Sequence, residues 1–243
     1  MRLGLLRAGE RKLNRTALGA VYLTTQEKGH VHMAYKALVF GAIGVMAETS
    51  ELQREAYNLA FQQSGLNWEW DAEHYLELLH RPGGLQRIID YAATTGTRLI
   101  DPEEVHARKV ANFRAAVLRA PLTLRPGIAE MIATAEDESI PMAWATTTGM
   151  QTLELMFAGF AGQIRPEQFA YIGDRTHVEE PKPAPDIYLR TIVELGIDPR
   201  DMLAIEDTPE SAEAALGAGL DVLAYPGKAA EGRLFPPGAR VVS

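Results

Sequence analysis

Short apolar runs alternate with longer segments of helical periodicity from about residue 37 to the end of the chain. Five of these runs have the length and composition of buried strands, at residues 37–40, 142–145, 170–173, 202–205 and 220–224. Strands separated by helices are typical of βαβ units and a parallel sheet. The pattern predicts an α/β fold with a Rossmann-like core, in which the strand ends converge on one edge of the sheet. That edge is the usual ligand site of such sheets.

About 100 residues between the first and second predicted strands contain no good strand pattern. Their periodicity predicts helices at residues 51–63 and 71–79, and Asp101 offers an N-cap before a proline and two glutamates. So large an insertion is not a loop. We predict a helical cap domain at residues 50–124, inserted into a core domain formed by residues 35–49 and 125–243.

The first 32 residues differ from the rest in charge, with six basic and two acidic side chains in a chain of net charge -8. Such a leader fits a transit peptide, a nucleic-acid arm or extra sequence upstream of the domain. It has no long apolar run, which argues against a secretory signal. We interpret residues 1–34 as a basic N-terminal extension, with Met33 as an alternative natural start, and keep a weakly ordered arm as the second interpretation.

Composition narrows the class of protein. A chain of 243 residues with 47% hydrophobic residues and no cysteine needs no disulfide, and it has no thiolate zinc site or cysteine nucleophile. The net charge argues against a nucleic-acid partner. No apolar run approaches the roughly 18 to 20 residues that span a bilayer, so we expect no membrane partner. We therefore expect a cytoplasmic globular protein, with organellar targeting by the leader left open.

Four motifs lie at the ends of the predicted strands, in a fixed order. They are Phe40-Gly41-Ala42-Ile43-Gly44, Ala145-Thr146-Thr147-Thr148, Gly173-Asp174 followed by Lys182-Pro183-Ala184-Pro185-Asp186-Ile187-Tyr188, and Ile205-Glu206-Asp207-Thr208. Together with the helical insertion after the first motif, they resemble the haloacid dehalogenase superfamily, in its phosphoglycolate phosphatase, β-phosphoglucomutase and CbbY-like branch. The resemblance covers residues 35–225.

The resemblance implies a phosphatase whose nucleophile is an aspartate after the first strand, with a second aspartate two residues later as general acid and base. Here Gly41 and Ile43 stand at these two catalytic positions. Loss of a covalent nucleophile costs on the order of 10⁴ to 10⁶ in rate. Three further family positions also differ: Val45 replaces a small polar residue, Gln53 a histidine, and Leu85 the cap lysine of a Gly-Gly-Lys motif.

The anion-binding half of the family site is retained. By the resemblance, Thr146 donates its hydroxyl to a phosphate oxygen, Thr147 contributes to the same loop, and Lys182 supplies positive charge. In the cap, Arg54 and Arg87 match basic positions that bind sugar phosphates. A small phosphorylated metabolite or phosphate is therefore the expected ligand, and a protein partner is an alternative.

The resemblance also implies Mg²⁺, held by the nucleophilic aspartate, a backbone carbonyl and a carboxylate of the fourth motif. Asp207 remains as the direct ligand, with Glu206 beside it. Since magnesium is held by only one or two carboxylates, the loss of one predicts weak or absent binding. We predict instead that Lys182 pairs directly with Asp207 and partly fills the metal position.

Each of these residues also has a purely structural interpretation. Lys182 and Asp207 could form an ion pair retained for stability, and Thr146 could cap a helix. Glu48 is the nearest acid that could replace the nucleophile, although a position at the hinge into the cap is the better interpretation. Asp174 fits a turn better than a catalytic role.

In the cap, solvated helix faces would account for Arg54 and Arg87, and packing would account for Trp68 and Trp70. Three hypotheses about function follow. The first is a pseudoenzyme that binds a phosphorylated metabolite or a protein without hydrolysis. The second is a slow or atypical Mg²⁺-dependent sugar-phosphate phosphatase, and the third is a structural or interaction protein that has lost the pocket.

Overall fold

The computed structural model describes residues 23–25, 31–41, 43–81, 83–97 and 101–242. Its centre is a six-stranded parallel sheet with the strand order β5-β4-β3-β6-β7-β8. The strands are β3 (Ala37–Phe40), β4 (Met142–Ala145), β5 (Tyr171–Gly173), β6 (Met202–Glu206), β7 (Asp221–Ala224) and β8 (Ala239–Val241). The predicted α/β fold with a parallel sheet is confirmed, and each of the five predicted strands is present.

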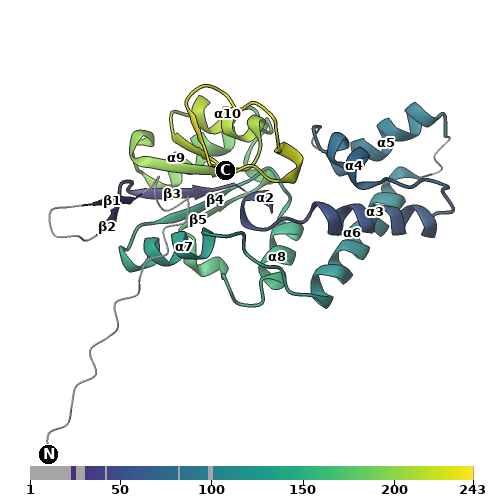
Figure 1. Ribbon diagram of the computed structural model, residues 1–243, viewed down its shortest axis with the longest axis horizontal. Coiled ribbons are helices and arrows are strands. Elements are labelled where there is room, and N and C mark those ends of the chain that lie inside the picture. Colours follow the sequence, from purple (N-terminus) through teal and green to yellow (C-terminus); the bar gives the residue numbers. More distant parts are fainter. Residues whose placement is uncertain (1–22, 26–30, 42, 82, 98–100, 243) are drawn as a thin grey trace, which may run out of the picture.

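Helices cover both faces of this sheet, because successive strand residues point to opposite sides. On one face, Leu38 and Phe40 pack with Trp144 in an apolar cluster that includes α7 (Ile128–Asp137) and α8 (Met150–Gly159). On the other face, Ala37 and Val39 pack against α9 (Asp186–Leu195) and α10 (Pro209–Gly217). Figure 1 shows α9 and α10 on one side of the sheet and α7 and α8 on the other.

A group of four helices lies beyond the end of β3 (Figure 1). The short helix α2 (Ile43–Met46) leads into α3 (Ser50–Gln63), which is followed by α4 (Ala72–Leu78), α5 (Gly84–Thr95) and α6 (Pro102–Arg119). The predicted N-cap is confirmed, since Asp101 accepts a hydrogen bond from the Glu104 N–H at 2.9 Å.

These four helices have an apolar cluster of their own. It contains Trp68 and Trp70, together with Tyr57, Phe61 and Tyr75, and the rings of Phe61 and Trp70 meet edge to face at 4.7 Å. The interpretation of both tryptophans as packing residues is confirmed. A separate core supports a separate cap, while the domain boundaries at residues 50 and 124 stay a prediction.

Two parts of the fold were not predicted. One is β8 at the edge of the sheet. The other is an antiparallel hairpin of β1 (Leu23–Thr25) and β2 (Val31–Met33). Most of the predicted N-terminal extension, residues 1–22 and 26–30, lies outside the described residues. Met33 is buried in the core, and its backbone N–H donates to Glu138 Oε2 at 2.9 Å.

The remaining short elements are four 3₁₀ helices: η1 (Pro166–Gln168), η2 (Arg175–His177), η3 (Pro199–Asp201) and η4 (Lys228–Ala230). Asp174 is the N-cap of η2, where it accepts from the Thr176 N–H at 2.8 Å, as expected for a turn residue. In the described part of the chain, no helix combines the length and the apolar character needed to cross a membrane.

Candidate functional site

The motifs at the carboxyl ends of β3, β4 and β6 meet because the three strands are neighbours in parallel register. Phe40, the last residue of β3, aligns with Trp144 of β4 on one side and with Ile205 of β6 on the other. The residues that follow, Gly41 and Glu206, are therefore adjacent. The predicted convergence of the motifs on one edge is observed for Gly41, Lys182, Glu206 and Asp207.

Lys182 lies at the centre of this edge with its side chain 8% exposed. Its ammonium Nζ donates to Glu206 Oε1 at 2.5 Å, to the Ala145 carbonyl at 3.0 Å and to the Tyr188 hydroxyl at 3.1 Å. An ammonium group has three donors, so every one of them has an acceptor in the protein. Lys182 also lies 4.9 Å from the centre of the Tyr188 ring.

The predicted ion pair between Lys182 and Asp207 is wrong, because the lysine pairs with Glu206 instead. Glu206 is the last residue of β6 and is fully buried, whereas Asp207 lies beyond the strand and is partly exposed. A fully buried carboxylate has the larger desolvation cost, so the lysine stabilises the protein most by pairing with it.

Hydrogen bonds of the Gly41 backbone tie this residue to the strands on both sides of β3. Its N–H donates to the Ile205 carbonyl at 2.9 Å, and its carbonyl accepts from the Trp144 indole at 2.5 Å. A Cβ atom placed on Gly41 would lie 2.3 Å from Glu206 Oε2, far inside van der Waals contact. The Glu206 carboxylate therefore fills the space that a side chain at position 41 would need.

Glu206 has one oxygen on Lys182 and one, Oε2, without a hydrogen-bond partner among the described residues. Burial raises the pKa of Glu206 to about 7, although Lys182 acts in the opposite direction. Burial also raises the pKa of Asp207, and Lys182 and Arg125 oppose this shift. Both acids of the fourth motif are thus in surroundings that disfavour the charged form.

Ile43 and Gly44, the last two residues of the first motif, begin α2, and Ala42 lies outside the described residues. The Ile43 carbonyl accepts from the Ala47 N–H at 2.8 Å within this turn. A Cβ atom on Gly44 would lie 1.8 Å from Asp207 Oδ2, so Asp207 packs directly against the α2 backbone. The side chain of Val45, two residues after Ile43, is fully buried in the sheet core.

Thr146 is 2% exposed, and its hydroxyl accepts from the Thr148 N–H at 3.0 Å. The residue therefore stabilises a tight turn after β4. The helix that follows begins at Met150, with Gly149 as its N-cap and no side-chain cap. Thr147 and Thr148 are partly exposed in the same loop.

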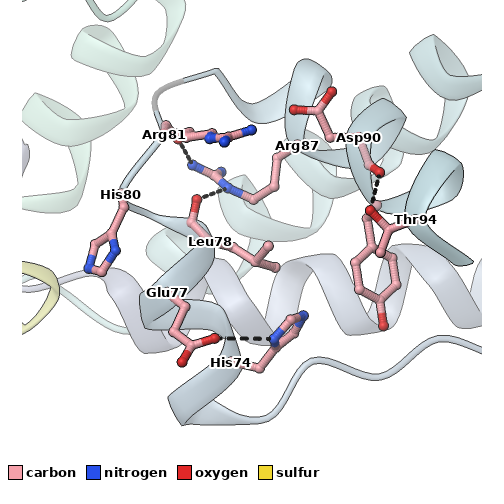
Figure 2. A pocket seen from close by; sticks show the side chains of 9 residues that line it. His74, Glu77, Leu78, His80, Arg81, Arg87, Asp90 and Thr94 are labelled. Atoms are coloured by element: carbon pink, nitrogen blue, oxygen red, sulfur yellow. Dashed lines mark hydrogen bonds and ion pairs between the residues drawn. The ribbon is translucent and has the colours of Figure 1, made fainter.

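The two cap arginines are already engaged by protein groups. Arg54 donates to both oxygens of Glu51 and to the Trp70 carbonyl. Arg87 donates from all three nitrogen atoms, to the Leu78 and Arg81 carbonyls and to the Tyr57 hydroxyl. Figure 2 shows the two carbonyl contacts of Arg87 at a pocket of about 360 Å³. Substrate binding by Arg54 and Arg87 stays a prediction.

The hinge between the sheet and the helical insertion is held by two charged residues. Glu48 accepts from the Lys228 N–H at 2.8 Å and from the Ser50 N–H at 3.0 Å, and contacts of this kind lower the pKa of its carboxyl. This is the hinge position expected for Glu48. Its contacts join the start of the insertion to η4 of the core.

Arg125, at the other end of the insertion, was missed by the sequence reasoning. It donates to the carbonyls of Gly44, Tyr225 and Pro226 at 2.6 to 2.9 Å, and its guanidinium lies 3.6 Å from the centre of the Tyr225 ring. The Arg-Pro-Gly turn at the end of the insertion was the available signal. Both hinge residues border a pocket of about 680 Å³.

The residues present do not fit an ordinary magnesium site. Among the described residues, no group of three or more acids or histidines is placed to hold a metal ion. Of the two acids in the fourth motif, Glu206 is bound by an ammonium group and Asp207 packs against Gly44. The Ile43 carbonyl, at the position where the family supplies a backbone ligand, is bonded within α2.

The fold, the motif order and the helical insertion define an α/β protein of the phosphatase class. A model of the haloacid dehalogenase-like hydrolase family matches residues 35–219, and the chain belongs to this family. The resemblance inferred from the four motifs is therefore confirmed. Family membership carries a general use of Mg²⁺, which the site of this chain does not fit.

The relatives of the chain include CbbY proteins. It is 37% identical over 203 residues to the plasmid-encoded protein CbbY of Cupriavidus necator, covering 79% of this chain and 78% of the relative. A crystal structure of CbbY from Rhodobacter sphaeroides in complex with phosphate is 34% identical with a TM-score of 0.77, covering 86% of this chain and 93% of that one. A mutant of the same protein, in complex with xylulose-(1,5)bisphosphate, is 35% identical with a TM-score of 0.76 over the same shares of both chains.

Proposed function

We propose that this chain is a pseudoenzyme of the haloacid dehalogenase family, which binds a phosphorylated metabolite or phosphate without hydrolysing it through an aspartyl-phosphate. The observation that carries the proposal is the contact between Gly41 and Glu206. The nucleophile position has no side chain, and the space for one is filled by a carboxylate that is held on Lys182. The position therefore has neither a nucleophile nor free space for the side chain of one.

The proton-transfer position supports the same proposal. Ile43 has no ionisable group, and it begins a helix whose first turn uses its carbonyl. A general acid and base that protonates a leaving group and activates water must bear a titratable side chain within hydrogen-bond reach. The two losses together remove both steps of the family reaction.

Ligand binding is supported by the loop after β4 and by the relatives. Thr147, Thr148 and the uncapped start of α8 lie at the sheet edge where such folds bind ligands. Two CbbY structures hold phosphate and xylulose-(1,5)bisphosphate, respectively. Because Lys182 is neutralised by Glu206, we expect weak binding of inorganic phosphate by the core alone. A phosphorylated metabolite with additional contacts is the better ligand class.

A slow phosphatase is the second candidate, and Glu206 is the observation that favours it. Its Oε2 has no hydrogen-bond partner in the described part of the chain and lies near the space of the missing nucleophile. Against this candidate, Glu206 is fully buried and its pKa near 7 leaves it partly protonated at neutral pH, which weakens a carboxylate as a nucleophile. A purely structural or interaction protein remains the third candidate, with no observation of its own.

A turnover assay on an aryl phosphate and a panel of sugar phosphates, with Mg²⁺, separates these candidates. We expect this chain to hydrolyse the phosphate esters no faster than the assay background. The Cupriavidus necator CbbY protein is assayed in parallel. Magnesium-dependent turnover that is abolished by Glu206→Gln would establish the slow phosphatase and contradict the pseudoenzyme. The double variant Gly41→Asp with Ile43→Asp is expected to gain Mg²⁺-dependent phosphatase activity, because it restores both lost carboxylates.

Thermal unfolding with millimolar phosphate and sugar phosphates tests the binding half of the proposal. A ligand at 100 times its Kd stabilises the folded state by about 2.7 kcal/mol, which is readily measured as a rise in Tm. No shift with any member of the panel would favour the structural or interaction protein instead.

A further inference from the structure

The hinge between the sheet and the helical insertion borders a pocket of about 680 Å³, which we call the hinge pocket. Glu48 and Arg125, the two hinge residues, line it together with residues from the segment 225–233 and with Val241 and Val242. In the part of the chain that the structure describes, no residue of the four motifs is among its lining residues. The hinge pocket is therefore a second cavity beside the sheet-edge site.

Two of the charged side chains at the hinge pocket are bound by other groups of the protein. The two carboxylate oxygens of Glu48 accept from the N–H groups of Ser50 and Lys228. Arg233 forms an ion pair with Glu210 of α10. These contacts hold both side chains in place, so neither is available as the main partner of a ligand.

Two cations and one acid at the hinge pocket lack a side-chain partner. Arg125 donates to three backbone carbonyls, which uses three of its five N–H groups. Among the described residues, the side chains of Lys228 and Glu231 form no hydrogen bond or ion pair. Two unpaired cations and one unpaired acid leave a single positive charge. A ligand with one negative charge complements this pocket.

The rest of the hinge pocket is largely apolar. Val242 is buried in the core cluster on the side of α7 and α8, whereas Val241 beside it is 56% exposed. Ala230 lines the pocket from η4, and the Tyr225 ring lies against the Arg125 guanidinium at 3.6 Å. Apolar walls with a few polar groups are typical of sites for small organic molecules. An apolar ligand group over Val241 would remove apolar surface from water.

The hinge pocket contacts both places where the chain passes between the core and the insertion. Glu48 joins the start of the insertion to η4, and η4 also contacts α4 of the insertion. Arg125 joins the end of the insertion to the Gly44 carbonyl of α2 and to the carbonyls that follow β7. A ligand in this pocket therefore contacts the residues that set the position of the insertion on the core.

We propose that the hinge pocket binds a small organic acid with one carboxylate and an apolar body, and that the bound acid stabilises the hinge as it is seen in this structure. The carboxylate is held by the remaining N–H groups of Arg125 and by the Lys228 ammonium, since a guanidinium presents paired donors that match a carboxylate. The apolar body lies against Val241 and Val242. The inference goes beyond the proposed function, because it requires no ligand at the sheet edge.

Three probes of similar length test the chemistry of this site on the full chain: hexanoate, its neutral amide hexanamide and the dicarboxylate adipate. Binding is measured by calorimetry. We expect hexanoate to bind, and hexanamide and adipate to bind about tenfold more weakly or less. The amide lacks the charge that Arg125 and Lys228 complement, and adipate places a second carboxylate against the apolar wall.

Two substitutions at exposed positions locate the binding. Lys228→Met removes one cation, and Val241→Asp places a negative charge beside the apolar body. Each is expected to weaken hexanoate binding about threefold to tenfold. The matched controls are Lys36→Met, an exposed lysine of the core, and Val193→Asp, a valine of α9 that is 72% exposed. Both controls lie outside the hinge pocket and should bind hexanoate as the wild type does.

Several outcomes overturn the site: no hexanoate binding at tens of millimolar, equal affinity for hexanoate and hexanamide, or an equal effect of the pocket variants and their controls. Competition between hexanoate and inorganic phosphate would place the acid at the sheet edge, and it would also overturn the inference. Hexanoate binding without any binding of phosphate would leave the hinge site standing and contradict the binding half of the proposed function.

Hydrogen exchange on the wild type tests the effect on the hinge and does not depend on a variant that folds well. The amide hydrogens of Ser50 and Lys228 report on it, because both donate to Glu48. At a hexanoate concentration about ten times its Kd, we expect these hydrogens to exchange about tenfold more slowly. Unchanged exchange at saturating hexanoate would contradict the stabilisation of the hinge.

Discussion

The Glu206 carboxylate and the backbone of Gly41 occupy one space, and this couples the two residues. Because position 41 is a glycine, the Glu206 carboxylate can approach the end of β3 closely while it forms an ion pair with Lys182. A side chain at position 41 must push Glu206 away or place a second carboxylate beside it. Two close carboxylates disfavour each other's charge unless a cation lies between them. The glycine at position 41 and the pairing of Glu206 with Lys182 are therefore structurally coupled.

Gly41→Asp tests this coupling by restoring the carboxylate alone. Without metal, we expect overpacking and like charge to lower the free energy of unfolding by about 1–3 kcal/mol. With millimolar Mg²⁺, part of the loss should return, because a third carboxylate at the site completes a set of hard oxygen ligands. Thermal unfolding with and without Mg²⁺ measures both effects.

Gly41→Asn is the control for Gly41→Asp, since it has the same shape without the charge. It should be destabilised to a similar degree and show no response to Mg²⁺. A rise in Tm with Mg²⁺ in the wild type, equal to that of Gly41→Asp, would contradict the claim that the natural site does not fit the metal.

Lys182→Met breaks the buried ion pair from one side. Because it leaves Glu206 buried without a partner, we expect a loss of about 3–5 kcal/mol in unfolding free energy at pH 8. The pKa of Glu206 is already raised to about 7, and loss of Lys182 raises it further. A raised acid pKa lowers stability as the pH rises through it, since the folded state holds the proton more tightly. The loss should therefore be smaller at pH 5.

Urea unfolding of the wild type and Lys182→Met at both pH values measures this difference. Lys36→Met breaks an exposed pair with Asp201 and should cost about 1 kcal/mol or less at either pH. A defect in Lys182→Met that does not depend on pH would contradict the assignment of the buried charge to Glu206.

At the scale of elements, the helical insertion is anchored where α6 passes over α8. Gly159, the last residue of α8, permits this approach, because a Cβ atom there would lie 2.4 Å from Val117 Cγ1 of α6. The Leu122 N–H donates to the Gly159 carbonyl at 2.8 Å just after α6 ends. The insertion thus packs on the core through a glycine as well as through its two hinges.

Gly159→Ala should lower the free energy of unfolding by about 1–3 kcal/mol, because it drives a methyl group into a stiff β-branched side chain. Gly217→Ala is the matched variant, at the last residue of α10, where a Cβ atom meets only Pro185 at 3.6 Å. It should be neutral or slightly stabilising, since alanine is the better helix former. Thermal unfolding of both variants gives the comparison, and equal losses would contradict the packing argument.

The elements that could be predicted from the sequence are those whose pattern of apolar residues agrees with their burial in the structure. The four residues of β3 and of β4 are all buried and stood out as continuous apolar runs. The edge strand β8 was missed because two of its three side chains are exposed and its run contains an arginine. The hairpin of β1 and β2 was missed because the first 32 residues were interpreted from their basic charge as an extension, and strands of three residues are too short to stand out.

The sequence was enough to predict where the motif residues of the candidate site lie, but not which side chains contact each other. The sheet order brings the motif residues together whatever their side chains do, so Gly41, Lys182 and Glu206 were placed correctly by sequence. The partner of Lys182 depends on which acid is buried, and adjacent acids look alike in a sequence. Arg125 was missed because its contacts are backbone carbonyls and a ring that are distant in the chain.

Over the whole molecule, charge is compensated unevenly between the sheet edge and the insertion. At the sheet edge the single lysine lies on a carboxylate, with a second acid beside it. In the insertion, Lys109 is buried and donates to the Gln53 amide oxygen, and Arg87 is near enough to lower the pKa of Lys109. The protein must therefore carry the desolvation cost of a buried lysine whose acceptor among the described residues is a neutral amide oxygen.

The pH dependence of stability tests that cost in the unliganded protein. Burial lowers the pKa of Lys109 from its ordinary 10.5 to about 8. Between these two pH values the unfolded chain binds more protons than the folded one, so stability rises with pH across that window. Below about pH 8 both states are charged and the full cost is present.

Removal of the charge should therefore stabilise the unliganded protein at neutral pH. At pH 7 we expect the free energy of unfolding of Lys109→Met to exceed that of the wild type by about 1–3 kcal/mol. The difference should shrink as the pH rises from 8 towards 10.5, because the wild-type lysine becomes neutral. Urea unfolding of both proteins at a series of pH values measures it, and Lys36→Met should show no such convergence. A Lys109→Met protein that is less stable than the wild type at pH 7 would mean that the ring and amide contacts of Lys109 already outweigh its desolvation.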